Sequence, residues 1–183
     1  AASDVYKRQV DTILNLEGSK WDGARDVLNQ FRLNGRYYCA IYEISFDSLL
    51  YYRKSVVEGA GLQDPRTLFE NDEWTWDTFL DMARQFQQSG DGKYVIEGYN
   101  PENEFVVSTG TPIIENDGTK LINNMNNANV ERVMDLLSTL QKENLRYPLH
   151  ELNGWSVNPK AWAQGDILFY GNGGTWELSL IHI

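Results

Sequence analysis

The sequence contains few of the residues that support covalent or redox chemistry. Cys39 is the one cysteine among the 183 residues, so no disulfide can form within the chain. Because Cys39 lies in an apolar run that favours a β-strand, we expect its thiol to be buried and inert. The cysteine content therefore leaves the redox compartment undecided.

Histidine is also scarce, and the common catalytic motifs are missing. Two histidines occur, and His150 is the one that lies outside the C-terminal tail, residues 178–183. The chain has no Gly-x-Ser-x-Gly, His-Glu-x-x-His or Cys-x-x-Cys motif, which argues against nucleophilic and zinc enzymes. We therefore predict no catalytic residue, no metal site and no cofactor.

Basic residues are fewer than acidic residues, and long hydrophobic runs are absent. The chain has 16 lysines and arginines and 26 acidic residues, which gives a formal net charge of −10. Nucleic acids and anionic membrane surfaces are bound by clustered lysine and arginine, so neither is predicted as a partner. No apolar run approaches the ~20 residues that a membrane-spanning helix needs.

Apolar and aromatic residues are present in quantities that support a folded core. The apolar fraction is 42% and the aromatic fraction 13%. Strand-like and helix-like patterns alternate, which indicates an α/β layered fold. The expected strands are residues 36–41, 94–99 and 167–170, and the expected helices are residues 55–60, 76–86, 101–110, 130–140 and 159–164.

Capping residues and turns locate several boundaries of these elements. Ser55 is expected to cap its short helix, Thr75 the next one, and Asn127 or Asn129 the helix that begins near residue 130. Residues 116–118 are predicted to form a turn between two short extended segments. The expected elements beyond these are an acidic loop around residues 71–73 and a glycine turn over residues 171–174.

Four segments of the chain match known sequence motifs. Residues 34–54 (NGRYYCAIYEISFDSLLYYRK) are similar to the motif NGKYYG...PY...LYYNK. Residues 58–62 with 74–79 resemble EAGL...TWDEF, residues 161–165 resemble AFAQGK, and residues 173–177 resemble GGTWE. In this order the four segments resemble the extracellular solute-binding proteins of ABC importers, family 1, the carbohydrate-type receptors related to the maltose-binding protein. Together they cover most of the chain.

The resemblance implies a type II periplasmic-binding fold, in which the ligand lies between two lobes. It assigns residues 10–44 to part of lobe one, up to the first hinge crossing, and residues 45–177 to most of lobe two. Residues 1–9 and 178–183 resemble translated sequencing-adaptor sequence. We therefore interpret them as artefactual ends and the chain as a fragment.

Five residues are candidate ligand contacts. Asp47 and Glu43 lie near the crossing, where carboxylate oxygens can accept hydrogen bonds from vicinal sugar hydroxyls. Trp176 follows a glycine-rich turn, and its indole can stack on the apolar face of a pyranose ring. Asn100 and Asn172 are candidate amide donors and acceptors in a polar cleft.

The resemblance supports two of these contacts, since related receptors often have an acid or amide near Asp47 and a binding tryptophan at the position of Trp176. Each contact also has a plainer interpretation: the two acids can be solvated, and the tryptophan can belong to the core. The chain departs from the family pattern at Glu43 and Arg53, which replace a proline and an asparagine. Trp76 lies on the apolar stripe of its helix and is interpreted as structural.

The resemblance implies a substrate-binding receptor of an ABC importer. Such a receptor is not an enzyme: it captures a sugar or oligosaccharide and delivers it to membrane permease subunits as a monomer. It is extracytoplasmic, either a cell-surface lipoprotein or a periplasmic protein. The residues alone leave two alternatives open: a secreted glycoside hydrolase, which needs two carboxylates across a cleft, and a non-catalytic carbohydrate-binding module.

Overall fold

The computed structural model describes residues 10–43, 49–98, 101–148 and 159–173. Residues 10–43, here called the N-terminal unit, form a small cluster of short elements around Leu16, Leu28 and Tyr37, which are buried. Its elements are η2 (Val10–Thr12), η3 (Ser19–Ala24), α1 (Arg25–Asn29), β1 (Arg32–Leu33) and β2 (Arg36–Tyr37).

The remaining described residues, 49–173, are here called the sheet unit, because they are built on a three-stranded sheet with the order β3-β7-β4. β7 (Ile167–Gly173) is the central strand. It pairs antiparallel with β3 (Leu49–Tyr52) and parallel with β4 (Tyr94–Gly98). Since parallel neighbours need a crossover, the helices between β4 and β7 cover the sheet.

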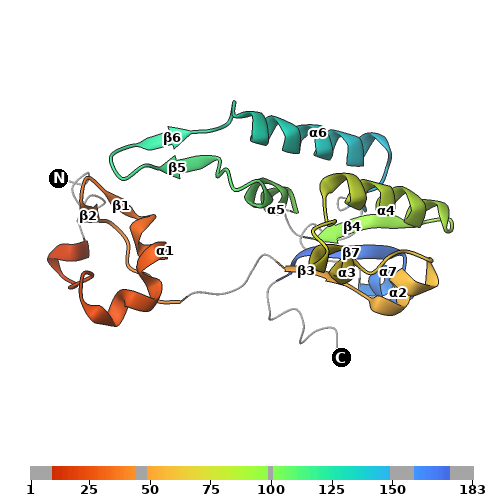
Figure 1. The fold of residues 1–183 in the computed structure, drawn as a ribbon, viewed down its shortest axis with the longest axis horizontal. Helices are drawn as coiled ribbons and strands as arrows, with labels where there is room; N and C mark the ends of the chain where they lie inside the picture. The colour runs from red at the N-terminus through yellow and green to blue at the C-terminus, as the bar shows by residue number, and fades with distance from the viewer. Residues whose placement is uncertain (1–9, 44–48, 99–100, 149–158, 174–183) are drawn as a thin grey trace.

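Helices enclose both faces of this sheet (Figure 1). α4 (Trp76–Gln88) packs against β4, and its Phe79, Met82 and Phe86 enter the main core. α7 (Pro159–Gln164) lies on the opposite face, where Trp162 contacts Tyr170 with ring centroids 6.0 Å apart. The other helices of the sheet unit are α2 (Lys54–Gly59), α3 (Pro65–Glu70), α5 (Pro101–Ser108) and α6 (Ala128–Lys142).

The antiparallel hairpin of β5 (Ile114–Asn116) and β6 (Leu121–Asn123) extends from the sheet unit to the N-terminal unit (Figure 1). The Asn116 side-chain amide donates to the carbonyl oxygens of Gln30 at 2.8 Å and Arg32 at 3.0 Å. The backbone N–H of Asn34 donates to the carbonyl oxygen of Gly118 at 2.7 Å. This turn therefore joins the two units at a point remote in sequence from residues 44–48.

Several predicted boundaries are confirmed. The Thr75 hydroxyl accepts from the N–H of Thr78 at 3.2 Å and caps α4, and Asn127 caps α6 through the N–H of Asn129. The turn over residues 116–118 lies between β5 and β6 as expected. α5 and α7 occupy the predicted segments, although α5 ends at Ser108.

The prediction of a strand over residues 36–41 with a buried Cys39 is wrong. β2 ends at Tyr37, because its partner β1 is two residues long, and the chain then runs without regular structure. Cys39 is exposed. The apolar run that suggested burial therefore faces solvent over part of its length; the Tyr42 side chain is 97% exposed.

Two further local predictions are wrong, and one helix was not predicted. Ser55 lies inside α2, whose N-cap is Arg53, and not at its start. Residues 65–70 form the helix α3, which was not predicted, because Asp64 caps it and proline is favourable at the first helical position. The expected acidic loop around residues 71–73 follows α3, outside any helix or strand. Residues 171–173 continue β7 instead of forming a turn, because Gly171 pairs with Gly98 and Gly173 pairs with Leu49.

Candidate functional site

Three strand ends meet at one edge of the central sheet. Leu49, the first residue of β3, pairs with Gly173, the last residue of β7. Gly98, the last residue of β4, pairs with Gly171. The start of β3 and the carboxyl ends of β4 and β7 therefore share an edge, the place where open α/β sheets bind ligands.

Glycine is required where β4 and β7 approach each other at this edge. Gly98 has φ +146°, a conformation that side chains rarely adopt. A Cβ atom at Gly98 would stand 1.8 Å from the carbonyl oxygen of Gly171. The two backbones are therefore held closer than any other residue type at position 98 would permit.

The predicted ligand contacts lie close in sequence to this edge. Asp47 precedes β3 by two residues, Asn100 follows β4 by two residues, and Trp176 follows β7 by three residues; all three lie outside the described residues. Asn172 is part of β7, and its side chain is outside the description too. The structure thus brings together the strand ends next to these four residues.

Glu43 is the fifth predicted contact. It follows β2 in the N-terminal unit, in a segment without regular structure, and its side chain is exposed. No described residue forms an ion pair with it. Its role as a ligand contact stays a prediction.

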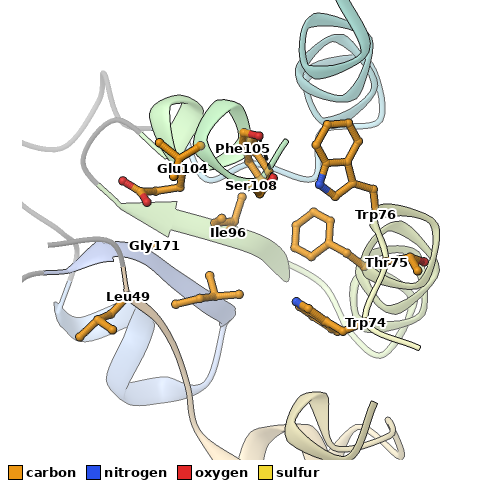
Figure 2. Close-up of a pocket in the computed structure, with 12 residues that line it drawn as sticks. Leu49, Trp74, Thr75, Trp76, Ile96, Glu104, Phe105, Ser108 and Gly171 are labelled. Atoms are coloured by element: carbon orange, nitrogen blue, oxygen red, sulfur yellow. Dashed lines mark hydrogen bonds between the residues drawn. The ribbon is translucent and has the colours of Figure 1, made fainter. Parts of the chain in front are cut away.

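A pocket of about 430 Å³ lies above the sheet beside this edge (Figure 2). Leu49, Ile96 and Gly171 of the sheet contribute to its floor. α5 and the start of α4 form its walls. The full lining is Leu49, Leu50, Trp74, Thr75, Trp76, Phe79, Ile96, Glu104, Phe105, Val107, Ser108 and Gly171.

Aromatic contacts fix one wall of the pocket. Trp74 contacts Phe169 of β7 with ring centroids 5.7 Å apart and an interplanar angle of 66°, which is the edge-to-face geometry that aromatic pairs favour. Phe79 lies 5.7 Å from Phe105 and so joins α4 to α5. Trp76 is half-buried, and the guanidinium of Arg132 lies over its ring at 5.1 Å.

The pocket also has polar groups that are available to a ligand. In Figure 2 the indole nitrogens of Trp74 and Trp76 lie on the sides of the rings that face the pocket. Neither N–H has a hydrogen-bond partner among the described residues. The Glu104 carboxylate has no such partner among them either. An ion pair between Glu102 and Arg146 instead ties α5 to the segment that follows α6.

Glu97 is the buried charged residue of this region, with 1% of its surface exposed. Side chains alternate along a strand, so Glu97 points to the face opposite Ile96, which lines the pocket. Glu97 therefore lies beside Tyr170, its neighbour in the register, on the face that α7 covers. It belongs to the packing beneath the edge and not to the pocket.

Three lining residues of this pocket were not predicted from the sequence: Trp74, Trp76 and Glu104. Trp76 was interpreted as structural, and it does contact the main core, but it also borders the pocket. The available signal was the position of Trp74 before the N-cap Thr75, outside the apolar stripe of α4. The role of Glu104 could not be predicted, because nothing in its local sequence indicates which side of α5 packs on the sheet.

No group of three metal-binding side chains occurs within the part of the chain that the structure describes. Among the same residues, no helix is both long and apolar enough to traverse a bilayer.

The family model of the bacterial extracellular solute-binding proteins matches residues 3–181. This chain belongs to that family. The match supports the resemblance found in the four sequence segments, and the family's description assigns its members to the outside of the cytoplasm. A search of curated proteins found no match.

Solved structures of sugar-binding and ABC substrate-binding proteins share the fold. The sugar-binding protein MalE from Xanthomonas citri covers all of this chain at 18% identity, with a TM-score of 0.66. The ABC transporter associated binding protein from B. animalis subsp. lactis, in complex with β-1,6-galactobiose, covers 96% at 18% identity with a TM-score of 0.63. An ABC substrate-binding protein from Listeria monocytogenes, in complex with cycloalternan, covers 98% at 15% identity with a TM-score of 0.62.

These similarities confirm the predicted α/β architecture as a type II periplasmic-binding fold. The chain spans less than half the length of these three structures: 45%, 42% and 45%, respectively. The division into lobes at residues 44 and 45, and the interpretation of residues 1–9 and 178–183 as artefactual ends, stay predictions.

Proposed function

We propose that the protein is the substrate-binding receptor of an ABC importer and captures a neutral sugar or oligosaccharide. The observation that carries this proposal is the convergence of three strand ends on one sheet edge, next to an aromatic pocket, in a chain that belongs to a solute-binding family. Similar structures were solved with β-1,6-galactobiose, cycloalternan and laminaribiose.

The ligand contacts that we propose at this edge come from both chemical classes that recognise sugars. Trp176 stacks on a pyranose face, while Asp47 accepts hydrogen bonds from two neighbouring hydroxyls. Asn100 and Asn172 bond to further hydroxyls through their amides, and Glu43 approaches from the N-terminal unit. Asp47, Asn100, Asn172 and Trp176 belong to segments next to or within the paired strand ends.

The proposed mechanism is capture and delivery. The sugar binds between two lobes, the lobes close around it by a hinge movement, and the loaded receptor presents both lobes to a membrane permease. The receptor is a monomer outside the cytoplasm, held as a lipoprotein or free in the periplasm. It transports its ligand unchanged and performs no catalysis.

Replacing Trp176 tests the proposed site. In the full-length protein, Trp176→Ala should weaken sugar binding by at least about 1 kcal/mol, because a stacked aromatic face is lost. Isothermal titration calorimetry with laminaribiose and with β-1,6-galactobiose measures the effect. Trp176→Phe is the matched control, since it keeps an aromatic face and should retain most of the affinity. Equal affinity in the wild type and the alanine variant would remove Trp176 from the site.

The same preparations separate a receptor from the two alternatives. A glycoside hydrolase would release reducing ends from these disaccharides over hours, and neutralising one carboxylate would stop the release. A carbohydrate-binding module would bind without compaction in small-angle X-ray scattering. We expect intact sugar and a smaller radius of gyration on binding.

A further inference from the structure

We propose that the pocket bounded by Trp74, Trp76, Glu104 and Phe105 is a second sugar-ring subsite, so that the ligand is an oligosaccharide of at least two rings. This inference rests on the proposed function, because it extends the same binding edge. All four residues belong to the described part of the chain.

The pocket has the composition that a pyranose ring requires. A pyranose presents an apolar face of C–H groups and a rim of hydroxyls. Trp74, Trp76 and Phe105 supply aromatic surface for the apolar face. The unpartnered indole N–H groups donate to hydroxyl oxygens, and the Glu104 carboxylate accepts from hydroxyl groups. A purely apolar ligand would leave these groups without partners.

The pocket is formed before any ligand arrives. Contacts of Trp74 with Phe169, and of Phe79 with Phe105, anchor its aromatic wall to the sheet and to α5. Arg132 lies over Trp76, and Glu102 holds α5 through Arg146. A rigid aromatic wall loses little conformational entropy on binding, which favours affinity.

The pocket lies beside the sheet edge at which we place the first subsite. Leu49 and Gly171, which line it, belong to the strands whose ends meet at the binding edge. In Figure 2 the Glu104 carboxylate lies on the side of the pocket nearer this edge, and the two tryptophans lie on the opposite side. One ring at the edge and one in the pocket therefore fit a single glycan chain. The pocket volume, about 430 Å³, is within the range of ordinary ligand sites.

The test compares each disaccharide with its own monosaccharide. Isothermal titration calorimetry of the full-length protein uses glucose against laminaribiose and galactose against β-1,6-galactobiose. In the wild type, we expect one of the disaccharides to bind at least about tenfold more tightly than its monosaccharide, since a second stacked and hydrogen-bonded ring is gained. Glu104→Ala and Trp76→Phe should each reduce this ratio at least about threefold, with monosaccharide affinity within about twofold.

Controls distinguish the second subsite from the first and from misfolding. Glu131→Ala removes an exposed acid of α6 that does not line the pocket, and should leave both affinities unchanged. Thermal unfolding of each variant monitors folding. Trp176→Ala should weaken monosaccharide and disaccharide together. If both pocket variants keep the wild-type ratio of disaccharide to monosaccharide affinity, the second subsite is wrong. The proposed function is not affected by that result. If the wild type binds none of the four sugars, the receptor proposal fails as well.

Discussion

At the scale of single residues, Gly98 has the most stringent structural role at the binding edge. Its backbone has φ +146°, and the Gly171 carbonyl oxygen occupies the space that a side chain would need. Neither feature is visible in the local sequence, where Gly98 lies within the predicted strand of residues 94–99. The requirement arises from the pairing of two strands that are more than 60 residues apart.

We predict that Gly98→Ala lowers the free energy of unfolding by at least about 2 kcal/mol, because both strain and overlap with backbone must be relieved. Urea unfolding of the full-length protein measures the change. Gly92→Ala is the matched control: Gly92 has φ +69° and no atom within 4 Å of the added Cβ, so strain alone should cost about 1 kcal/mol. Equal costs at the two positions would contradict the close approach of β4 and β7.

Asp64 should make stability dependent on pH in the acid range. The Tyr52 hydroxyl donates to its carboxylate at 2.6 Å and the Arg66 N–H at 2.9 Å, which lower the pKa of Asp64 below its ordinary 3.8. The charged form is therefore favoured more in the folded state than in the unfolded state. Its contribution to the free energy of unfolding is present above pH 3.8. This contribution is lost as the pH falls through the lower pKa of the folded state.

Asp64→Asn tests this assignment, because asparagine keeps an acceptor for both donors but does not titrate in this range. We expect the variant to lose less stability than the wild type when urea unfolding is compared at about pH 6 and about pH 3. Parallel pH profiles for the two proteins would show that Asp64 does not contribute through its charge.

The candidate site could be predicted from the sequence only in part. Asp47 and Trp176 were predicted because each lies in a segment with family resemblance. The strand ends beside them meet at one edge, and both ligand contacts stay predictions. Trp74 and Glu104 were missed because their accessibility depends on how α4 and α5 pack on the sheet. Cys39 was misassigned because an apolar run says nothing about whether a partner strand exists to cover it.

At the scale of elements, strong local signals were reliable. α4 was predicted from a Thr75 cap and an apolar stripe, and α6 from an asparagine cap, since both helices combine capping with amphipathic spacing. α3 was missed because it has six residues and little apolar periodicity. The order β3-β7-β4 and the pairing of β3 with β7 depend on contacts distant in sequence, which no local pattern encodes.

The β5–β6 hairpin should be held on the N-terminal unit mainly by one amide group. Asn116→Asp keeps the oxygen that accepts from the N–H of Gly118, but it replaces the donor to Gln30 and Arg32 with a second acceptor. The second carboxylate oxygen of the aspartate and the carbonyl oxygens of Gln30 and Arg32 would have no proton between them, so they would repel one another. We expect hydrogen–deuterium exchange to accelerate in residues 30–37 and 114–123.

Asn123→Asp is the matched control in the same hairpin. Its side-chain oxygen accepts from the N–H of Met125 at 3.0 Å, and aspartate can do the same. Exchange in residues 30–37 should therefore stay at the wild-type rate. Similar acceleration in both variants would indicate a general effect of added negative charge and not a specific contact.

At the scale of the whole molecule, the sheet unit contains the proposed binding edge. The N-terminal unit is connected to it through residues 44–48 in the sequence and through the hairpin contact. The formal charge of −10 accords with a neutral ligand, which is recognised by stacking and hydrogen bonds and not by attraction between net charges. A fold shared with sugar-binding proteins at 15% to 18% identity persists because the layers and strand order, not particular side chains, define it.

The central claim is that a sugar binds where β3 begins and β7 ends. A crystal structure of the full-length protein with bound laminaribiose tests it most directly. We predict a pyranose ring within about 4.5 Å of the Trp176 indole, with hydroxyls in hydrogen-bond contact with Asp47. A ring bound away from this edge, or a Trp176 side chain enclosed in the hydrophobic core, would contradict the account.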